Sequence, residues 1–179
     1  MVSFSRRRLA QMLGASLLPI GGVIAVVRST GYELPLVRRG RLVVLSASEF
    51  SVLDAVARRM CAAPAELVAP SVDDVDVVGF IDRFVATMNE TIRTDLFRFL
   101  SVLEQLCPLL IGSVTRFSKL DPQSQDSVLA KLEAHDDGLL RGAFSGLKAL
   151  IFMGYYRDPL TWPLLRYDGP TIARAAGGP

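Results

Sequence analysis

Few residues in this chain have side chains and spacings that suggest chemistry. The only histidine, His135, lies in the polar sequence of residues 133–137, which is typical of a helix end. A histidine there is stabilised by the helix dipole, so its presence needs no catalytic role. Asp73, Asp74 and Asp76 are interrupted by valines and lack the glycine and distal glutamate of a calcium-binding loop. They are better explained as the solvated start of a helix, where negative charge is favourable.

No familiar catalytic or nucleotide-binding motif is present either. The chain has no G-x-S-x-G, no G-x-G-x-x-G and no G-x-x-x-x-G-K-S/T sequence. An enzyme built on Tyr155 or Asp158 is disfavoured because a general base suited to neutral pH is missing. One histidine and the absence of C-x-x-C argue against a zinc site or c-type haem. We therefore expect no catalytic, cofactor-binding or metal-binding residue in this chain.

The two cysteines, Cys61 and Cys107, allow two interpretations. Each is expected at the end of a helix, and an exported protein would meet an oxidising compartment. A Cys61–Cys107 disulfide would then stabilise the fold by about 4 kcal/mol in the chain-entropy model. Alternatively, both are buried free thiols that act as small apolar groups. The sequence does not set their separation, so both interpretations stay open here.

Composition predicts one folded domain with an unevenly charged chain. Of 179 residues, 50% are hydrophobic and 21% are charged, which excludes disorder of the whole chain. The net charge of +2 does not indicate a nucleic-acid-binding protein. Seven arginines and one glutamate give residues 1–44 a charge of +6, whereas the remaining residues carry −4. The basic character thus belongs to the N-terminal segment, and the body is acidic.

The first 27 residues have the layout of an export signal. Ser5, Arg6, Arg7 and Leu9 resemble the twin-arginine translocation signal, although Ala10-Gln11 replaces the usual Leu-Lys that follows. The uncharged run of residues 12–27 is shorter than the roughly 20 apolar residues of a spanning helix and contains glycines and a proline. An uncleaved membrane anchor is the main alternative, and an ordinary cytosolic helix is a further one.

The rest of the chain predicts an all-α fold, a compact bundle of about five helices. We expect a linker over residues 28–44, with a short extended piece at 42–44, and a helical domain over residues 45–170. A capping box at Ser46–Glu49, an acidic start at Ser71–Asp74 and the pair Asp121-Pro122 mark helix beginnings. Gly138 is the expected end of the helix that Asp121 opens. The expected helices cover residues 46–62, 71–89, 91–106, 121–138 and 139–153, and residues 171–179 form a flexible tail.

The most unusual sequence follows the last expected helix. Three of the four tyrosines and the only tryptophan lie between residues 155 and 167, among prolines and glycines. They do not follow a helical period, so we expect an irregular segment. Aromatic residues in such a segment either form a binding surface or fold back over the bundle as a lid, each polar tip finding a partner. Composition alone favours the lid.

This segment resembles the C-terminal signature of the gluconate 2-dehydrogenase subunit 3 family. The resemblance extends over residues 45–170, including Leu45-Ser46-x-x-Glu49-Phe50 and Leu140-Arg141-x-x-Phe144-x-x-Leu147. A glycine-rich insert that many relatives place between Asp-Pro and Trp is missing here. Such a resemblance implies partner binding by the signature residues, which are Tyr155, Tyr156, Asp158, Pro159, Trp162, Tyr167, Gly169 and Pro170.

The resemblance also implies a function. Members are non-catalytic small subunits that bind, stabilise and escort a large FAD-dependent sugar or alcohol dehydrogenase, often with a multihaem cytochrome c. FAD is then expected in the partner and no cofactor in this chain. Export through the twin-arginine translocase implies a periplasmic protein, or one tethered to the periplasmic face of the inner membrane by its leader. The alternative is a stand-alone exported helical protein that binds a ligand or acts as a membrane-tethered interaction module. Escort function further predicts an apolar face exposed on the bundle.

Overall fold

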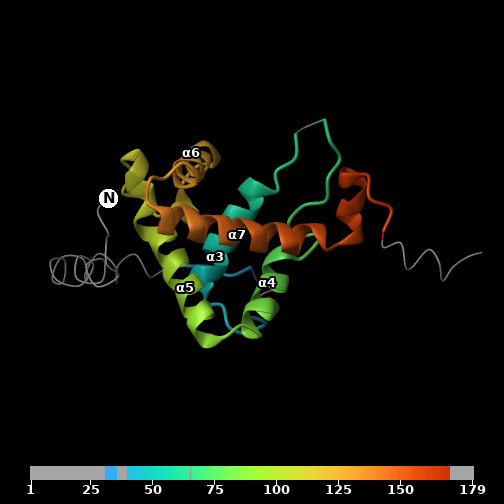
Figure 1. The fold of residues 1–179 in the computed structure, drawn as a ribbon, viewed down its shortest axis with the longest axis horizontal. Helices are drawn as coiled ribbons and strands as arrows, with labels where there is room; N and C mark the ends of the chain where they lie inside the picture. Colours follow the sequence, from blue (N-terminus) through green and yellow to red (C-terminus); the bar gives the residue numbers. More distant parts are fainter. Residues whose placement is uncertain (1–30, 36–39, 65, 170–179) are drawn as a thin grey trace, which may run out of the picture. The chain divides into compact units, whose positions relative to one another are not determined.

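The computed structural model describes residues 31–35, 40–64 and 66–169 (Figure 1). All elements in this part are helical, which confirms the expected all-α fold. They lie in the unit Glu33–Pro179, and Met1–Tyr32 form a separate unit. The leader residues Ser5, Arg6, Arg7 and Leu9, the signature residue Pro170 and the tail lie outside the described residues. The α-helices are α3 (Ala47–Met60), α4 (Val77–Ala86), α5 (Glu90–Gln105), α6 (Pro122–Glu133) and α7 (Gly138–Tyr156), and the 3-10 helices are η2 (Cys107–Ile111), η3 (Phe117–Lys119) and η4 (Pro159–Leu165).

Helix α3 is the centre of the bundle. It contacts α4, α5, α6 and α7, and the long helix α7 lies across it (Figure 1). Leu53, Val56 and Ala57 on α3 are fully buried. Its start confirms the predicted capping box, because Ser46 Oγ accepts from the Glu49 N–H at 3.3 Å and Glu49 Oε2 accepts from the Ser46 N–H at 2.6 Å. Within the described residues, no helix is both long enough and apolar enough to span a membrane.

A buried carboxylate on α4 holds the segment that leads into α3. Asp82 is only 2% exposed. Its Oδ2 accepts from the backbone N–H of Val43 at 2.6 Å, and its Oδ1 accepts from Val44 at 3.0 Å and Leu45 at 2.9 Å. The extended piece expected at 42–44 is therefore wrong: these residues bend around the carboxylate. Three donors compensate the cost of burying the charge.

Helix α4 begins six residues later than Ser71, where the sequence predicted its start. Ser71 and Asp74 do exchange capping hydrogen bonds, with Asp74 Oδ2 accepting from the Ser71 N–H and Ser71 Oγ from the Asp74 N–H. The chain then makes a turn instead of a helix, because Asp76 adopts a left-handed conformation with φ of 49°. This turn buries Val72 and Val75 in the core. Local capping chemistry was present, but core packing decided where the helix starts.

The boundary between the last two long helices differs from expectation. Asp121 caps α6 through the Ser124 N–H at 2.9 Å, and Pro122 occupies its first turn, as predicted. Gly138, however, does not end α6, which stops at Glu133. It is the first residue of α7, because Asp137 accepts from the N–H groups of the next turn and caps that helix.

The buried side of α5 includes a carboxylate. Leu106, which follows the end of α5 at Gln105, is exposed, whereas Cys107 in η2 is buried. Glu104, near the end of α5, is also buried. Its carboxylate accepts from the backbone N–H of Ser118 at 2.9 Å and from the hydroxyl of Ser118 at 2.6 Å. The carboxylate thereby fixes η3 against α5.

Helices α4 and α7 approach closely at a glycine. A Cβ placed on Gly154 would lie 3.2 Å from Phe80 Cδ1 and 3.2 Å from Val77 Cγ1. Val77 is fully buried and belongs to the core. Gly146, on the same helix, has no neighbouring atom within 4 Å of such a Cβ. Only the position at the contact with α4 therefore requires the absence of a side chain.

Asp82→Asn should lower the free energy of unfolding by about 2 kcal/mol or more. The substitution removes the charge and replaces one carboxylate oxygen by an NH₂ group. Because both oxygens of Asp82 face backbone N–H groups, this NH₂ group is placed opposite another donor in either orientation of the amide. The free energy is measured by urea denaturation followed by circular dichroism. Asp95→Asn is the control, because Asp95 forms only an exposed ion pair with Arg98 and should change stability by less than about 0.5 kcal/mol. Equal effects of the two substitutions would contradict the role assigned to Asp82.

Gly154→Val should destabilise the protein by about 1–3 kcal/mol, because the added side chain must push α4 and α7 apart. The matched substitution Gly146→Val should stay within about 0.5 kcal/mol of the wild type, since valine and glycine differ little in helix propensity. Thermal unfolding of the two variants measures the difference. A Gly154→Val protein as stable as Gly146→Val would show that the helix contact adapts freely.

Candidate functional site

The first two tyrosines of the aromatic segment lie inside α7. The prediction that Tyr155 and Tyr156 belong to an irregular segment is therefore wrong: they form the last turn of this helix. Tyr155 is buried, and its hydroxyl donates to the carbonyl oxygen of Pro70 at 2.7 Å. Burial raises the pKa of Tyr155 above its ordinary value, so the phenol stays a neutral donor. The spacing of four from Leu147 through Ile151 to Tyr155 was the sequence signal for this turn.

Side chains that follow α7 complete its C-terminal hydrogen bonds. Thr161 is fully buried, and its hydroxyl lies 3.3 Å from the Tyr155 carbonyl oxygen and 2.8 Å from that of Asp158. The indole N–H of Trp162 donates to the Tyr156 carbonyl oxygen at 3.2 Å. The carboxylate of Asp158 accepts from the Leu160 N–H at 3.0 Å and caps η4. The carbonyl oxygens of the last turn of α7 thus accept from the side chains of Thr161 and Trp162, of which Trp162 is a signature residue.

The chain after η4 folds back onto Trp162. The rings of Trp162 and Tyr167 meet edge to face with centroids 5.1 Å apart. Gly169 has φ of 99°, and a Cβ there would lie 3.0 Å from the Trp162 ring. Glycine is therefore required both by the left-handed conformation and by the close approach. These contacts show that Trp162, Tyr167 and Gly169 hold one another in place.

Arg157 joins this end of α7 to α4. Its Nη2 donates to the Val75 carbonyl oxygen at 2.9 Å, and its guanidinium lies 4.6 Å from the centre of the Phe80 ring. The guanidinium therefore makes one hydrogen bond and one cation–π contact to the same neighbouring helix region. The sequence by itself did not indicate a role for this arginine.

The segment leaves apolar side chains exposed, although the hydroxyl of Tyr155 and the indole N–H of Trp162 are hydrogen-bonded. We call Met153, Tyr156, Leu160, Leu165 and Tyr167 the C-terminal apolar surface; each is between 36% and 59% exposed. Pro159 is also exposed, whereas Tyr155 and Thr161 are buried. The segment is thus partly packed against the end of α7, as the lid alternative predicted, and partly exposed. The sequence pattern indicated Tyr156 and Tyr167 but not the methionine and the two leucines, because their exposure depends on the fold.

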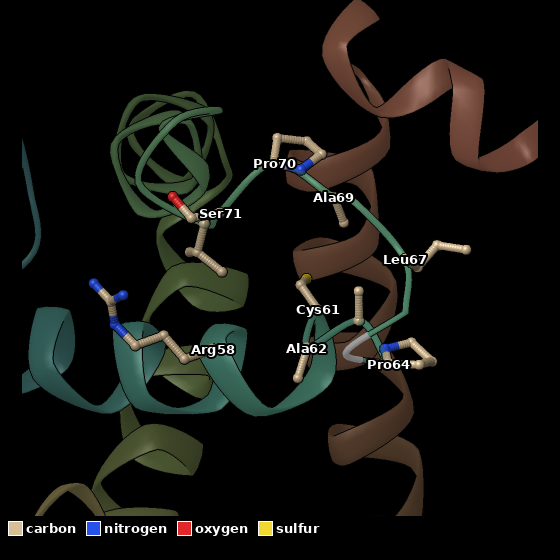
Figure 2. A pocket seen from close by; sticks show the side chains of 10 residues that line it. Arg58, Cys61, Ala62, Pro64, Leu67, Ala69, Pro70 and Ser71 are labelled. Atoms are coloured by element: carbon tan, nitrogen blue, oxygen red, sulfur yellow. The ribbon is translucent and has the colours of Figure 1, made fainter.

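A hollow of about 380 Å³ lies beside the end of α7 (Figure 2). The connection from α3 to α4 arches over it, and Cys61, Ala63, Leu67 and Pro70 contribute to its lining. Because Pro70 accepts the hydrogen bond from Tyr155, the arch is attached to the same turn of α7 that carries the aromatic residues. This hollow was not predicted from the sequence.

The residues considered for chemistry have structural partners. His135 Nδ1 accepts from the Asp137 N–H at 3.0 Å, just after the end of α6. Asp73 pairs with Arg58 at 2.8 Å, and Asp76 pairs with Arg83 at 3.2 Å. Across the described part of the chain, no three His, Cys, Asp or Glu side chains gather as metal ligands.

The structure shows Cys61 and Cys107 as free thiols. The disulfide considered from the sequence is not formed between them here. Cys107 is buried and Cys61 is half-buried at the hollow. Burial raises the pKa of each to about 11. Both are consequently protonated and weakly nucleophilic near neutral pH.

Comparison with known proteins identifies one family. The model of the family described as gluconate 2-dehydrogenase subunit 3 matches residues 47–169. This match runs from the start of α3 to the glycine that packs on Trp162. Searches of curated proteins and of solved structures gave no match.

Alkylation of Cys61 by N-ethylmaleimide should accelerate about tenfold for each pH unit up to roughly pH 10, because only the thiolate reacts and its pKa is about 11. Peptide mass spectrometry measures the rate separately at each cysteine, with glutathione as the control thiol. Cys107 should react far more slowly because it is buried. If the alkylation rate of Cys61 stops rising at the same pH as the alkylation rate of glutathione, the raised pKa of Cys61 is refuted.

Proposed function

The chain belongs to the gluconate 2-dehydrogenase subunit 3 family, and from that premise we propose that it is the non-catalytic small subunit of an FAD-dependent sugar or alcohol dehydrogenase. In this function it binds the large subunit, stabilises it and escorts it through the twin-arginine translocase. FAD belongs to the partner, and a cytochrome c subunit can complete the complex. The assembled protein is periplasmic, or is tethered to the periplasmic face of the inner membrane by the leader.

The observation that carries the proposal is the C-terminal apolar surface on an end of α7 whose backbone is already fixed. Thr161 and Trp162 bind the last carbonyls of α7, and Gly169 packs on the indole. Binding of a partner to this surface would therefore cost little conformational entropy. Exposed leucine and tyrosine side chains on a rigid support are the kind of residues that dominate protein interfaces.

Export supplies the physical reason for a subunit of this kind. A flavoprotein must fold around FAD before it leaves the cytoplasm, and the twin-arginine route accepts folded cargo. The residues Ser5, Arg6, Arg7 and Leu9 would supply the export signal for a partner that lacks one. Binding in the cytoplasm would also stabilise the folded partner by mass action.

Affinity purification of the tagged full-length chain from its native host tests the proposal. We expect a yellow, roughly equimolar flavoprotein, identified by mass spectrometry and by its visible flavin absorbance. Replacing Leu160 and Leu165 together by glutamine should lower the recovered flavin at least about tenfold, as expected for loss of interface anchors. The matched control replaces Leu109 and Leu139, which are similarly exposed leucines at η2 and at the start of α7, and should retain wild-type recovery.

Recovery of a lone colourless protein would overturn the proposal and favour the stand-alone ligand-binding or membrane-tethered protein. Equal loss of flavin in both double variants would instead contradict the assignment of the C-terminal apolar surface. Circular dichroism of each purified variant provides the check that the helical fold is retained.

A further inference from the structure

The hollow beside the connection from α3 to α4 is lined mostly by apolar residues. Its volume is about 380 Å³, and its lining is mostly alanine, proline, leucine and valine. Three sets of hydrogen bonds hold the arch: Leu67 N–H to the Pro64 carbonyl at 2.9 Å, Tyr155 hydroxyl to Pro70, and the reciprocal pair of Ser71 and Asp74. A hollow whose walls are set in advance can receive a group without ordering its own backbone first.

The edge of the hollow is apolar as well. Leu67 is half exposed, and Val68, next to it on the arch, is 98% exposed. Figure 2 shows Leu67 on the outer part of the arch while Cys61 lies below it. A hollow lined mostly by apolar residues and bordered by exposed apolar side chains can receive an apolar group. The hollow adjoins the turn of α7 that carries the aromatic segment, because Pro70 is bonded to Tyr155.

The charges around the hollow further restrict which groups can bind there. The only basic residue in its lining is Arg58, whose guanidinium already binds Asp54 at 2.8 Å and Asp73 at 2.8 Å. An incoming carboxylate or phosphate would have to compete with both of these carboxylates. Glu66 and Asp74 on the same connection add further negative charge. The surroundings thus repel an anionic ligand and attract positively charged groups placed beside the apolar one.

We propose that this hollow receives a large apolar side chain of the dehydrogenase subunit, flanked on that subunit by lysine or arginine. The inference rests on the proposed function and adds a second contact, separate in sequence from the C-terminal apolar surface but adjacent to it. An apolar anchor seated in a pocket and surrounded by complementary charges is a common arrangement at the centre of protein interfaces.

Cys61 provides a reporter for occupancy without any substitution. The chain has two cysteines, and Cys107 is buried away from solvent. N-ethylmaleimide is applied at about pH 9, where some Cys61 thiolate exists, to the free full-length chain and to the purified flavoprotein complex. We expect Cys61 to react at least about tenfold more slowly in the complex, with Cys107 slow in both. Equal Cys61 rates, or no reaction of Cys61 in the free chain, would overturn the proposal.

Filling the hollow gives an independent test. Ala63→Trp should lower flavin recovery at least about tenfold while leaving the free energy of unfolding unchanged. Ala130→Trp, at an exposed position on α6, should retain wild-type recovery. Full recovery with Ala63→Trp would refute the site, whereas a wild-type chain that recovers no flavoprotein would refute the proposed function itself.

Glu66→Gln should weaken the complex severalfold at low ionic strength and have no effect at high ionic strength. No effect at either would overturn the assignment of basic flanks.

Discussion

The carboxylate of Asp82, buried on α4, determines how the helical unit begins. It accepts hydrogen bonds from the three consecutive N–H groups of Val43, Val44 and Leu45. Those residues lead directly into the capping box of α3, the helix that contacts all the other long helices. The position of α3 relative to α4, and with it the core between them, thus depends on one charge whose burial is tolerable only because its donors are present.

Long-range bonds between a helical side chain and a connection recur elsewhere in the structure. Glu104 on α5 binds Ser118, and the Gln125 side-chain amide on α6 donates to the carbonyl oxygen of Phe117 at 3.1 Å. Tyr155 on α7 binds Pro70. In each case a side chain on a regular helix pairs with a polar group of an irregular segment. Long connections in a small bundle cannot satisfy their own backbone groups, so buried helical side chains do so for them.

Hydrogen bonds of this kind explain why the backbone of the candidate site is ordered while some of its apolar side chains are exposed. The Thr161 hydroxyl and the Trp162 indole N–H fix the aromatic segment on α7, while Tyr156, Leu160 and Leu165 remain exposed. The arch over the hollow is fixed in the same manner by Tyr155. A subunit whose task is to bind a folded partner needs such preformed apolar surfaces more than it needs reactive groups. The family assignment and the geometry of this end of the molecule therefore lead to the same kind of function.

By itself the sequence determined the helical class, the local starts of α3 and α6, the family and the segment that carries the aromatic residues. Those features depend on side chains within one or two turns of each other, as in Ser46 with Glu49 or Asp121 with Ser124. Only the tertiary structure decided that α4 starts at Val77, that Gly138 begins a helix, and which aromatic faces are exposed. Contacts such as Tyr155 with Pro70, separated by 85 residues, exist only after the core has brought α7 and the arch together. Residue order cannot show such pairs, because their energy depends on the packing of every helix between them.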